Sequence, residues 1–488
     1  MAWLAPMRLI SPAPTHSILA NMRNIVNFSI RLGGVAGVSV CVALLVMAVV
    51  FTVNAVMFTP GYERVRASLE RAIADGSILD ARGFGPSSFL STRRKRDIYA
   101  HDCLLWTAFL APTADRLVMT FRTPRLEAAK HPIDPTAPEN PDCQAVVQAL
   151  DVGDASPAKP TLVYYDRYIL AQRAIVQLLL EHFSVRTAAV ITKFATVSAF
   201  ALACLWAWRR RAWAVAAIAT LFLLFYGLGH FGGMLYFAPI DVTHAMVLLF
   251  ATSRPIGLAP PRNLVFLGAF YGSVVAVFEI LTGGIPMALV LLSLLTGISA
   301  QDRRSFTHRI SLLVFCFAVA VVSCFAVKLL VVSAIFGGNE FATYFGALLH
   351  RFHDDFIPEA DPFLLQYLSN RGLDYPILYL VASYGYWSLL IGWGSSVFGV
   401  VLVAVGLISL LAATLHFFRR KRSENLSIPP SLLGSWLGVG ILLMWIALFW
   451  NHTMLHPFFM ARLLLIPILC GAVAVLGVAQ DRKLDARQ

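Results

Sequence analysis

Charged side chains are scarce in this sequence. Asp, Glu, Lys and Arg make up only 14% of its 488 residues, whereas hydrophobic residues make up 58%. Because a soluble globular domain carries about 25% charged residues, this composition excludes a soluble protein and indicates an integral membrane protein. The net charge of +12 is dispersed in short clusters beside apolar runs, a pattern typical of membrane orientation signals and not of nucleic-acid binding.

Signatures of cofactor binding are also missing. The sequence contains neither a P-loop nor a Rossmann-type glycine motif, and it has no CxxC pair or His/Cys spacing typical of a metal site. We therefore predict no cofactor and no nucleic-acid partner. One run, RFHDDF at 351–356, is compatible with a divalent metal ion or a sugar hydroxyl, although a solvated loop is the more common meaning of such a run.

The apolar runs predict an all-α polytopic membrane protein with about ten transmembrane helices, since each needs about 20 apolar residues to cross the bilayer. The first run is too long for a signal peptide and lacks a clear cleavage site, so we interpret it as a span. The predicted spans are 34–57, 187–208, 212–229, 241–253, 263–282, 285–300, 310–336, 396–417, 432–450 and 458–478.

Lysine and arginine predict the orientation of these helices. Cytoplasmic connections are enriched in Lys and Arg, and the outer connections 230–240 and 451–457 contain neither. With both termini in the cytoplasm, all basic clusters fall on that side, and we expect a multi-pass protein of the bacterial inner (plasma) membrane. A further apolar stretch is 376–393. If it spanned the membrane, the basic cluster Arg419–Arg422 would lie on the outer side, so we interpret the stretch as an interfacial or re-entrant helix.

This topology divides the chain into segments, of which the largest polar one follows the first span. The segments are a cytoplasmic tail 1–33, the first transmembrane helix 34–57, an extracytoplasmic loop 58–186, transmembrane helices two to seven in 187–336, a second extracytoplasmic loop with the interfacial helix in 337–395, the last three transmembrane helices in 396–478, and a cytoplasmic tail 479–488.

The large loop 58–186 has helical patterns of its own. Residues 61–74 show helical spacing of apolar side chains, and residues 97–112 predict an amphipathic helix that rests on the membrane. Residues 123–160, rich in Pro, Asp and Ala, predict irregular structure, and 163–184 predict a helix that leads into the second span.

His101 and Asp102 are the candidate catalytic residues of this loop. They begin the apolar half of the 97–112 segment, where an apolar surface raises the pKa of a carboxylate toward the range of a general base. A surface aspartate that caps a helix is the simpler alternative. Cys103 and Cys143 are the only cysteines in polar sequence, and we predict a disulfide between them if the loop faces an oxidising compartment.

Polar residues near the predicted outer ends of the helices form the candidate substrate site. In the loop, Tyr164, Tyr165 and Arg167 form an aromatic and basic cluster. Tyrosine rings can stack on sugars and arginine can bind phosphate, although a belt of such residues at the lipid headgroups explains the cluster equally well. Arg462 and Lys328 lie inside apolar runs, where a charge indicates a functional site or a snorkelling anchor. Asp241 and His244 begin the fourth span on the same side. The candidate binding residues are Tyr164, Tyr165, Asp166, Arg167, Glu279, Lys328, Asn451, His452, His456 and Arg462.

This layout resembles the GT-C superfamily of polytopic glycosyltransferases, in the many spans, the large first outer loop with Asp102, and the polar outer cavity. The resemblance implies transfer of a sugar from a polyprenyl-phosphate carrier to a glycan, lipid or protein acceptor of the cell envelope. Asp102 would then deprotonate the acceptor hydroxyl, and Arg462, Lys328, His456 or Arg167 would stabilise the departing phosphate. A transporter or flippase, a polymerase of lipid-linked saccharides, and a scaffold remain alternatives, with membrane lipids as surroundings in every case.

Overall fold

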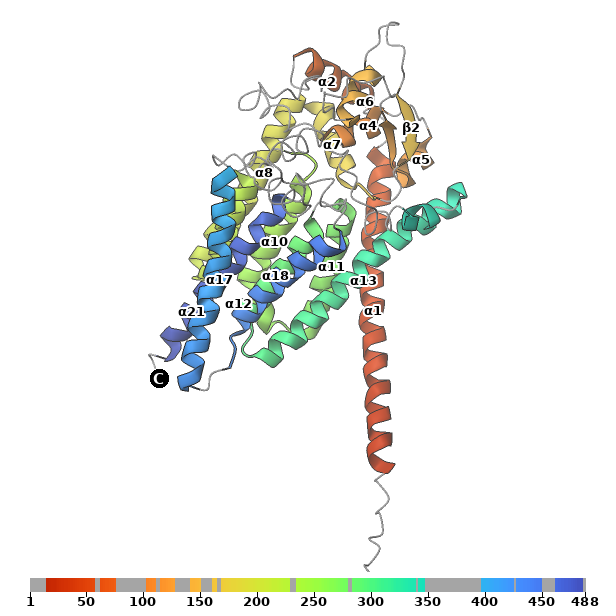
Figure 1. Cartoon of the computed structure of the whole chain (residues 1–488). Coiled ribbons are helices and arrows are strands. Elements are labelled where there is room, and N and C mark those ends of the chain that lie inside the picture. Colours follow the sequence, from red (N-terminus) through yellow and green to blue (C-terminus); the bar gives the residue numbers. More distant parts are fainter. Residues whose placement is uncertain are drawn as a thin grey trace, which may run out of the picture.

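The computed structural model describes most of the chain. The described residues are 15–57, 62–75, 102–110, 115–127, 141–150, 160–164, 168–228, 234–279, 283–338, 341–346, 396–424, 427–449 and 461–485. Figure 1 shows a bundle of long helices with a group of short helices and one small sheet at one end.

The helices and strands follow one another along the chain in a simple order. They are α1 (Thr15–Met57), α2 (Tyr62–Ala74), α4 (Asp102–Leu110), α5 (Arg116–Phe121), β1 (Pro124–Glu127), α6 (Pro141–Leu150), β2 (Thr161–Tyr164), α7 (Gln172–His182), α8 (Val185–Arg209), α9 (Trp213–Phe222), the π-helix η2 (Leu223–Gly227), α10 (Ala238–Ser253), the 3₁₀ helix η4 (Ile256–Leu258), α11 (Pro261–Phe278), α12 (Gly284–Ser299), α13 (Arg303–Phe336), α17 (Ser396–Glu424), α18 (Pro430–Leu448), the 3₁₀ helix η6 (Ala461–Leu464) and α21 (Leu465–Asp485).

Several of these helices are long and apolar enough to cross a membrane, which confirms an integral multi-pass membrane protein. Within the described residues there are 7 such helices, in α1, α8, α11, α13, α17, α18 and α21. Three shorter apolar helices, 213–227, 238–253 and 284–299, lie within or near further predicted spans. They are shorter than the length that spans a bilayer unaided, so the count of about ten stays a prediction.

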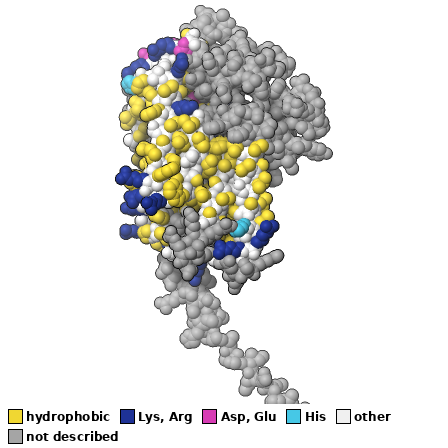
Figure 2. Space-filling model, turned by 90° about the vertical axis from the view of Figure 1, so that its left-hand side faces the viewer, with side chains coloured by type: hydrophobic (Ala, Val, Ile, Leu, Met, Phe, Trp, Pro, Cys, Tyr) yellow, Lys and Arg dark blue, Asp and Glu magenta, His cyan; other side chains and the backbone are white. Residues whose placement is uncertain are grey.

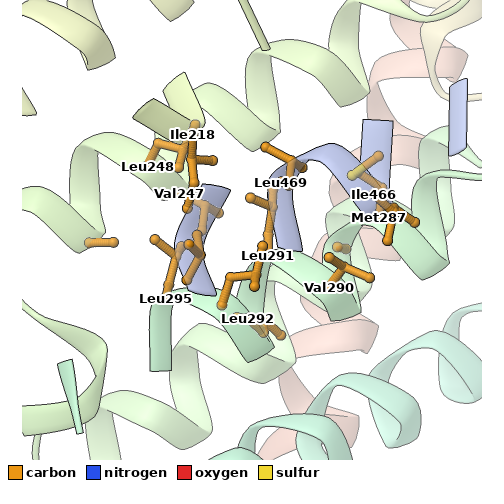
Figure 3. Packing of buried hydrophobic residues seen from close by; sticks show 14 of the residues in the cluster. Ile218, Val247, Leu248, Met287, Val290, Leu291, Leu292, Leu295, Ile466 and Leu469 are labelled. Carbon is orange, nitrogen blue, oxygen red and sulfur yellow. The ribbon is translucent and has the colours of Figure 1, made fainter. Parts of the chain in front are cut away.

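The membrane bundle is apolar inside and outside, as a lipid solvent permits. Side chains of α9, α10, α12 and α21 meet in its core, among them Ile218, Leu248, Leu291 and Leu469 (Figure 3). Hydrophobic side chains also cover its outer surface. Lys and Arg lie at both ends of the face in Figure 2, beside Asp and Glu at the upper end, and below the apolar band at the end of the bundle away from the short helices. The exposed residues at that end include Arg209, Arg254, Arg262, Arg303 and Arg304.

Glycine allows α17 and α21 to approach each other closely. A Cβ atom on Gly406 would lie 2.6 Å from the carbonyl oxygen of Pro467, and one on Gly471 would overlap the carbonyl oxygen of Gly406. Between membrane helices, where burial from water supplies little driving force, such backbone contact is a main source of association. A larger residue at either position would force these two helices apart.

We call the described residues between Tyr62 and His182 the cap domain. Its helices are α2, α4, α5, α6 and α7, of which α4 and α6 pack against the antiparallel pair β1–β2, where Pro124 faces Tyr164. The core of the cap domain contains Leu69 of α2, Trp106 of α4 and Val146 of α6. The cap domain thus has its own hydrophobic core, separate from that of the bundle.

The cap domain differs from the sequence predictions in three places. The described side chains of α4 are buried, because α2, α6, α7 and β1 pack against this helix, so over 102–110 the prediction of an amphipathic helix resting on the membrane is wrong. The predicted irregular stretch 123–160 contains β1 and α6, and the predicted helix 163–184 begins only at Gln172, after β2. The two strands have four residues each, too few for an alternating pattern to stand out.

Helix boundaries in the membrane bundle also differ from the predictions. Helix α1 begins at Thr15, inside the predicted tail, and α21 continues to Asp485. The predicted spans marked only the apolar part of these helices, and polar helical turns outside a bilayer carry no hydropathy signal. Most of the second predicted loop, including the stretch 376–393, lies outside the described residues.

Candidate functional site

Residues 234–237 directly precede membrane helix α10 and pack against the cap domain, and we call them the coupling segment. The side chains of this segment lie in the hydrophobic core of the cap domain, whereas Ile240, three residues later, lies in the core of the bundle. The segment turns directly into α10, where the backbone N–H of Asp241 donates to the carbonyl of Phe237 at 3.1 Å. The two cores therefore meet at this turn.

Asp102 holds the coupling segment from the cap-domain side. Its side chain is 0% exposed. Oδ1 accepts the backbone N–H of Tyr236 at 2.9 Å, and Oδ2 accepts that of Leu235 at 3.2 Å. Burial raises the pKa of Asp102 to about 7, against the opposing effect of the two hydrogen bonds. Both carboxylate oxygens are engaged with backbone, so Asp102 acts as an anchor between α4 and the start of α10.

A buried ion pair lies one helical turn beyond the coupling segment. The guanidinium of Arg462, in η6, pairs with Oδ1 of Asp241 in α10. The two side chains are 3% and 0% exposed. The guanidinium carbon of Arg462 also lies 4.3 Å from the ring centroids of both Tyr226 and Phe237. Rings at this distance attract a cation through their π-electrons, so two aromatic rings and one carboxylate hold Arg462.

Tyr226 reaches this position from the π-helical turn η2. Its hydroxyl donates a hydrogen bond of 2.8 Å to the backbone carbonyl of Arg462. A π-helical turn adds one residue to the helix and rotates the following side chains, and here it ends the α9–η2 helix with Tyr226 facing η6. The tyrosine therefore fixes both the main chain and the side chain of Arg462.

His244 lies one turn deeper in α10 than Asp241. Its Nδ1 lies 2.7 Å from the hydroxyl of Tyr271, on α11. Within the part of the chain that the structure describes, Nε2 of His244 and Oδ2 of Asp241 are buried and have no hydrogen-bond partner. Such atoms cost free energy unless water or a ligand satisfies them, and both belong to side chains that can exchange protons.

Glu279 completes this group of ionisable side chains. It caps the end of α11, is fully buried, and accepts the backbone N–H of Gly284 at 2.8 Å. Gly283, directly before Gly284, has φ +98, a conformation that favours glycine. Glu279 also interacts electrostatically with Arg462. We call Asp241, His244, Glu279 and Arg462 together the charged centre.

Lys328 lies apart from the charged centre, against the cap domain. Its ammonium donates to the carbonyl of Phe121, at the end of α5. Arg173 of α7 donates to the carbonyl of Met119, which is also in α5. Burial lowers the pKa of Arg173 to about 10. Cations commonly satisfy the free carbonyls at a helix C-terminus. The structure therefore gives Lys328 a fixed partner in the cap domain and does not bring it into the charged centre.

Tyr164 has one ring face covered. The guanidinium carbon of Arg122 lies 3.9 Å from the ring centroid of Tyr164, although Tyr164 is 39% exposed.

Cys103 is disulfide-bonded, and its pairing with Cys143 stays a prediction because the side chain of Cys143 lies outside the described residues. The remaining predicted site residues that lie outside them are His101, Tyr165, Asp166, Arg167, Asn451, His452 and His456.

Within the described ranges, no group of three or more His, Cys, Asp or Glu side chains is arranged to hold a metal ion. The charged centre is instead suited to proton transfer and to contact with one anionic group, through Asp241, His244 and Arg462. Comparisons of the chain with protein families, with curated proteins and with solved structures find no match.

Sequence reasoning found part of this centre and missed the rest. It singled out Glu279 and Arg462, and it placed Asp241 and His244 at the same end of the bundle, because ionisable residues stand out in apolar runs. It missed Tyr226, Phe237 and Tyr271, which hold the charged residues in place. Aromatic residues are common in membrane helices, so nothing in the sequence distinguishes these three.

Proposed function

We propose that the protein is a membrane glycosyltransferase that moves a sugar from a polyprenyl-phosphate carrier to an acceptor at the extracytoplasmic face. In this proposal about ten helices span the bacterial inner membrane, both termini are cytoplasmic, and the cap domain is extracytoplasmic. The exposed arginines at the opposite end of the bundle support this orientation, since cytoplasmic connections are enriched in basic residues.

The observation that carries the proposal is the buried pair of Arg462 and Asp241 beside the cap domain. Charged side chains inside a membrane protein are costly and tend to be kept where they act on a substrate or ion. The pair lies beside the end of η2 and the start of η6, which supply Tyr226 and Arg462. In the proposal, the lipid-linked donor approaches between the helices and its acceptor approaches from the aqueous side.

The chemistry follows from the atoms that face the centre. The acceptor hydroxyl attacks the anomeric carbon, the bond from that carbon to the phosphate oxygen breaks, and the polyprenyl phosphate leaves as an anion. Oδ2 of Asp241, which lacks a hydrogen-bond partner among the described residues, takes the hydroxyl proton. Arg462, which contacts two aromatic rings, supplies positive charge to the leaving phosphate. Asp102 was the base in our sequence-based prediction, but its two oxygens already accept backbone N–H groups, so the proposal assigns this step to Asp241.

Binding of polyprenyl phosphate to the purified protein in lipid nanodiscs tests the proposal. We expect the double variant Arg462→Met, Asp241→Leu, which removes both charges together, to weaken binding at least tenfold. Arg254→Ala is the matched control, because Arg254 is exposed at the opposite end of the bundle. Equal binding by the wild type and the double variant would contradict a role for the charged centre in donor recognition.

A proton-coupled transporter of lipid-linked saccharides is the second candidate. It is favoured by the line of polar groups that runs from Asp241 to His244 and Tyr271 inside the bundle, because buried carboxylate and histidine chains form proton pathways in transporters. Proteoliposomes that hold a polyprenyl-phosphate hexose separate the two. Transport predicts movement of the intact donor across the bilayer with a pH gradient, whereas transfer predicts release of the sugar without one.

A further inference from the structure

The cap domain and the charged centre are connected through a very short path. Asp102 accepts two N–H groups of the coupling segment, from Leu235 and Tyr236. The next residue, Phe237, places its ring against the guanidinium of Arg462. The carbonyl of Phe237 then accepts the N–H of Asp241. A displacement of the coupling segment therefore moves both residues of the buried ion pair.

The hydrogen bonds of Asp102 differ from those of an ordinary helix cap. Asp115, at the start of α5, accepts the N–H groups of Leu117 and Val118, two and three residues later. Asp102 accepts from residues 133 and 134 positions later in the chain. A local cap stabilises one helix, whereas these bonds join two parts of the fold with separate cores.

The neighbouring structure holds Asp102 firmly in place. The adjacent residue Cys103 is disulfide-bonded and fully buried, and Leu105 and Trp106 of the same helix lie in the cap-domain core together with the coupling segment. The carboxylate thus extends from a helix packed into the cap-domain core to two buried N–H groups of the coupling segment, and a buried N–H is costly to leave unsatisfied.

We infer that Asp102 is a positioning residue, which fixes the coupling segment and thereby orients Asp241 and Phe237 toward Arg462. This inference rests on the proposed function for its catalytic meaning, because it assigns the cap domain the task of setting the geometry of the transfer site. The carboxylate itself does not contact the substrate in this account. Its effect reaches the centre through the backbone of residues 235–241.

Amide hydrogen exchange, followed by mass spectrometry at about pH 8, tests this role directly. In Asp102→Asn one accepting oxygen becomes an NH₂ group that cannot accept an N–H. We expect exchange in peptides covering 234–245 to become about tenfold faster, the scale of one lost bond to a charged group. Asp102→Glu keeps two accepting oxygens and should restore a large part of the protection.

Asp115→Ala is the control, since it removes an acceptor of two backbone N–H groups elsewhere in the cap domain. It should speed exchange near 117–118 and leave 234–245 unchanged. Exchange in 234–245 that stays at the wild-type rate in Asp102→Asn, or that rises equally in Asp115→Ala, would overturn the inference.

A second measurement covers the case in which Asp102→Asn does not fold. In the wild-type protein, the amides of Leu235 and Tyr236 both donate to the carboxylate of Asp102, so exchange at these two positions should be as slow as in the buried helix α4. Fast exchange of both amides would overturn the inference as well. These experiments need no sugar donor, so a protein that shows the coupling but never transfers sugar would refute only the proposed function.

Discussion

Arg462 and Asp241 form an ion pair inside the bundle, with both side chains almost completely buried. The two residues are far apart in the sequence, and each comes from the end of a helix that approaches the cap domain. Removing one member of a buried pair leaves an uncompensated charge, whereas removing both does not. This difference separates the contribution of the pair from that of either residue.

We predict that Asp241→Asn lowers the free energy of unfolding by about 3–5 kcal/mol, because the charge of Arg462 then loses its main partner. The double variant Arg462→Met, Asp241→Leu should lose clearly less than the sum of the single variants. The control is Glu70→Gln, which breaks the exposed pair of Arg66 and Glu70 and should cost no more than about 1 kcal/mol. Denaturant unfolding in detergent measures all of these, and additive losses would argue against the buried pair.

The stability of the protein should depend on the ionisation of Asp102. Its pKa is raised from 3.8 to about 7 by burial, so between these values the folded protein holds a proton that the unfolded chain releases. Stability from this residue is therefore fullest at low pH and falls as pH rises toward 7, by up to about 1.4 kcal/mol per pH unit. Thermal unfolding of the wild type and Asp102→Asn across this range should show the slope in the wild type alone. Parallel pH profiles would exclude this effect.

Lys328 should stabilise the junction between α13 and the cap domain. Lys328→Met removes the donor to the carbonyl of Phe121, and we expect a loss of about 1–3 kcal/mol from the unsatisfied carbonyl. Lys193→Met is the control, because Lys193 is exposed on the membrane helix α8 and should change stability by no more than about 0.5 kcal/mol. Equal thermal shifts in the two variants would mean that the contact of Lys328 contributes little.

The disulfide of Cys103 should be protected and stabilising. Alkylation of the unfolded, unreduced protein should leave Cys103 unmodified and label free cysteines such as Cys204. Cys103→Ser should lower the unfolding free energy by about 2–5 kcal/mol, whereas Cys204→Ser should have a small effect. Alkylation of Cys103 without prior reduction would contradict the bridge.

The sequence predicts the membrane class and several charged residues of the centre, and physical reasons explain why it stops there. Apolar runs reveal membrane helices because lipid excludes polar side chains, and Glu279 and Arg462 stand out for the same reason. The role of Asp102 depends on its contact with Leu235 and Tyr236, more than a hundred residues away. Local patterns carry no information on such a contact.

The short elements of the cap domain were the other difficulty. Strands β1 and β2 have four residues each, too few for a periodic pattern to stand out. Helix α4 carries apolar residues on all sides, and the sequence alone does not tell whether protein or lipid covers them. Tertiary packing decides both cases.

The measurement that tests the proposed function most directly is the release of polyprenyl phosphate from a set of labelled polyprenyl-phosphate hexoses, by purified protein in nanodiscs with membrane lipid as acceptor. We predict release by the wild type and by Arg254→Ala, and at least a hundredfold slower release by the double variant Arg462→Met, Asp241→Leu. Release at the wild-type rate by the double variant, or no release from any of these donors by the wild type, would contradict the proposal.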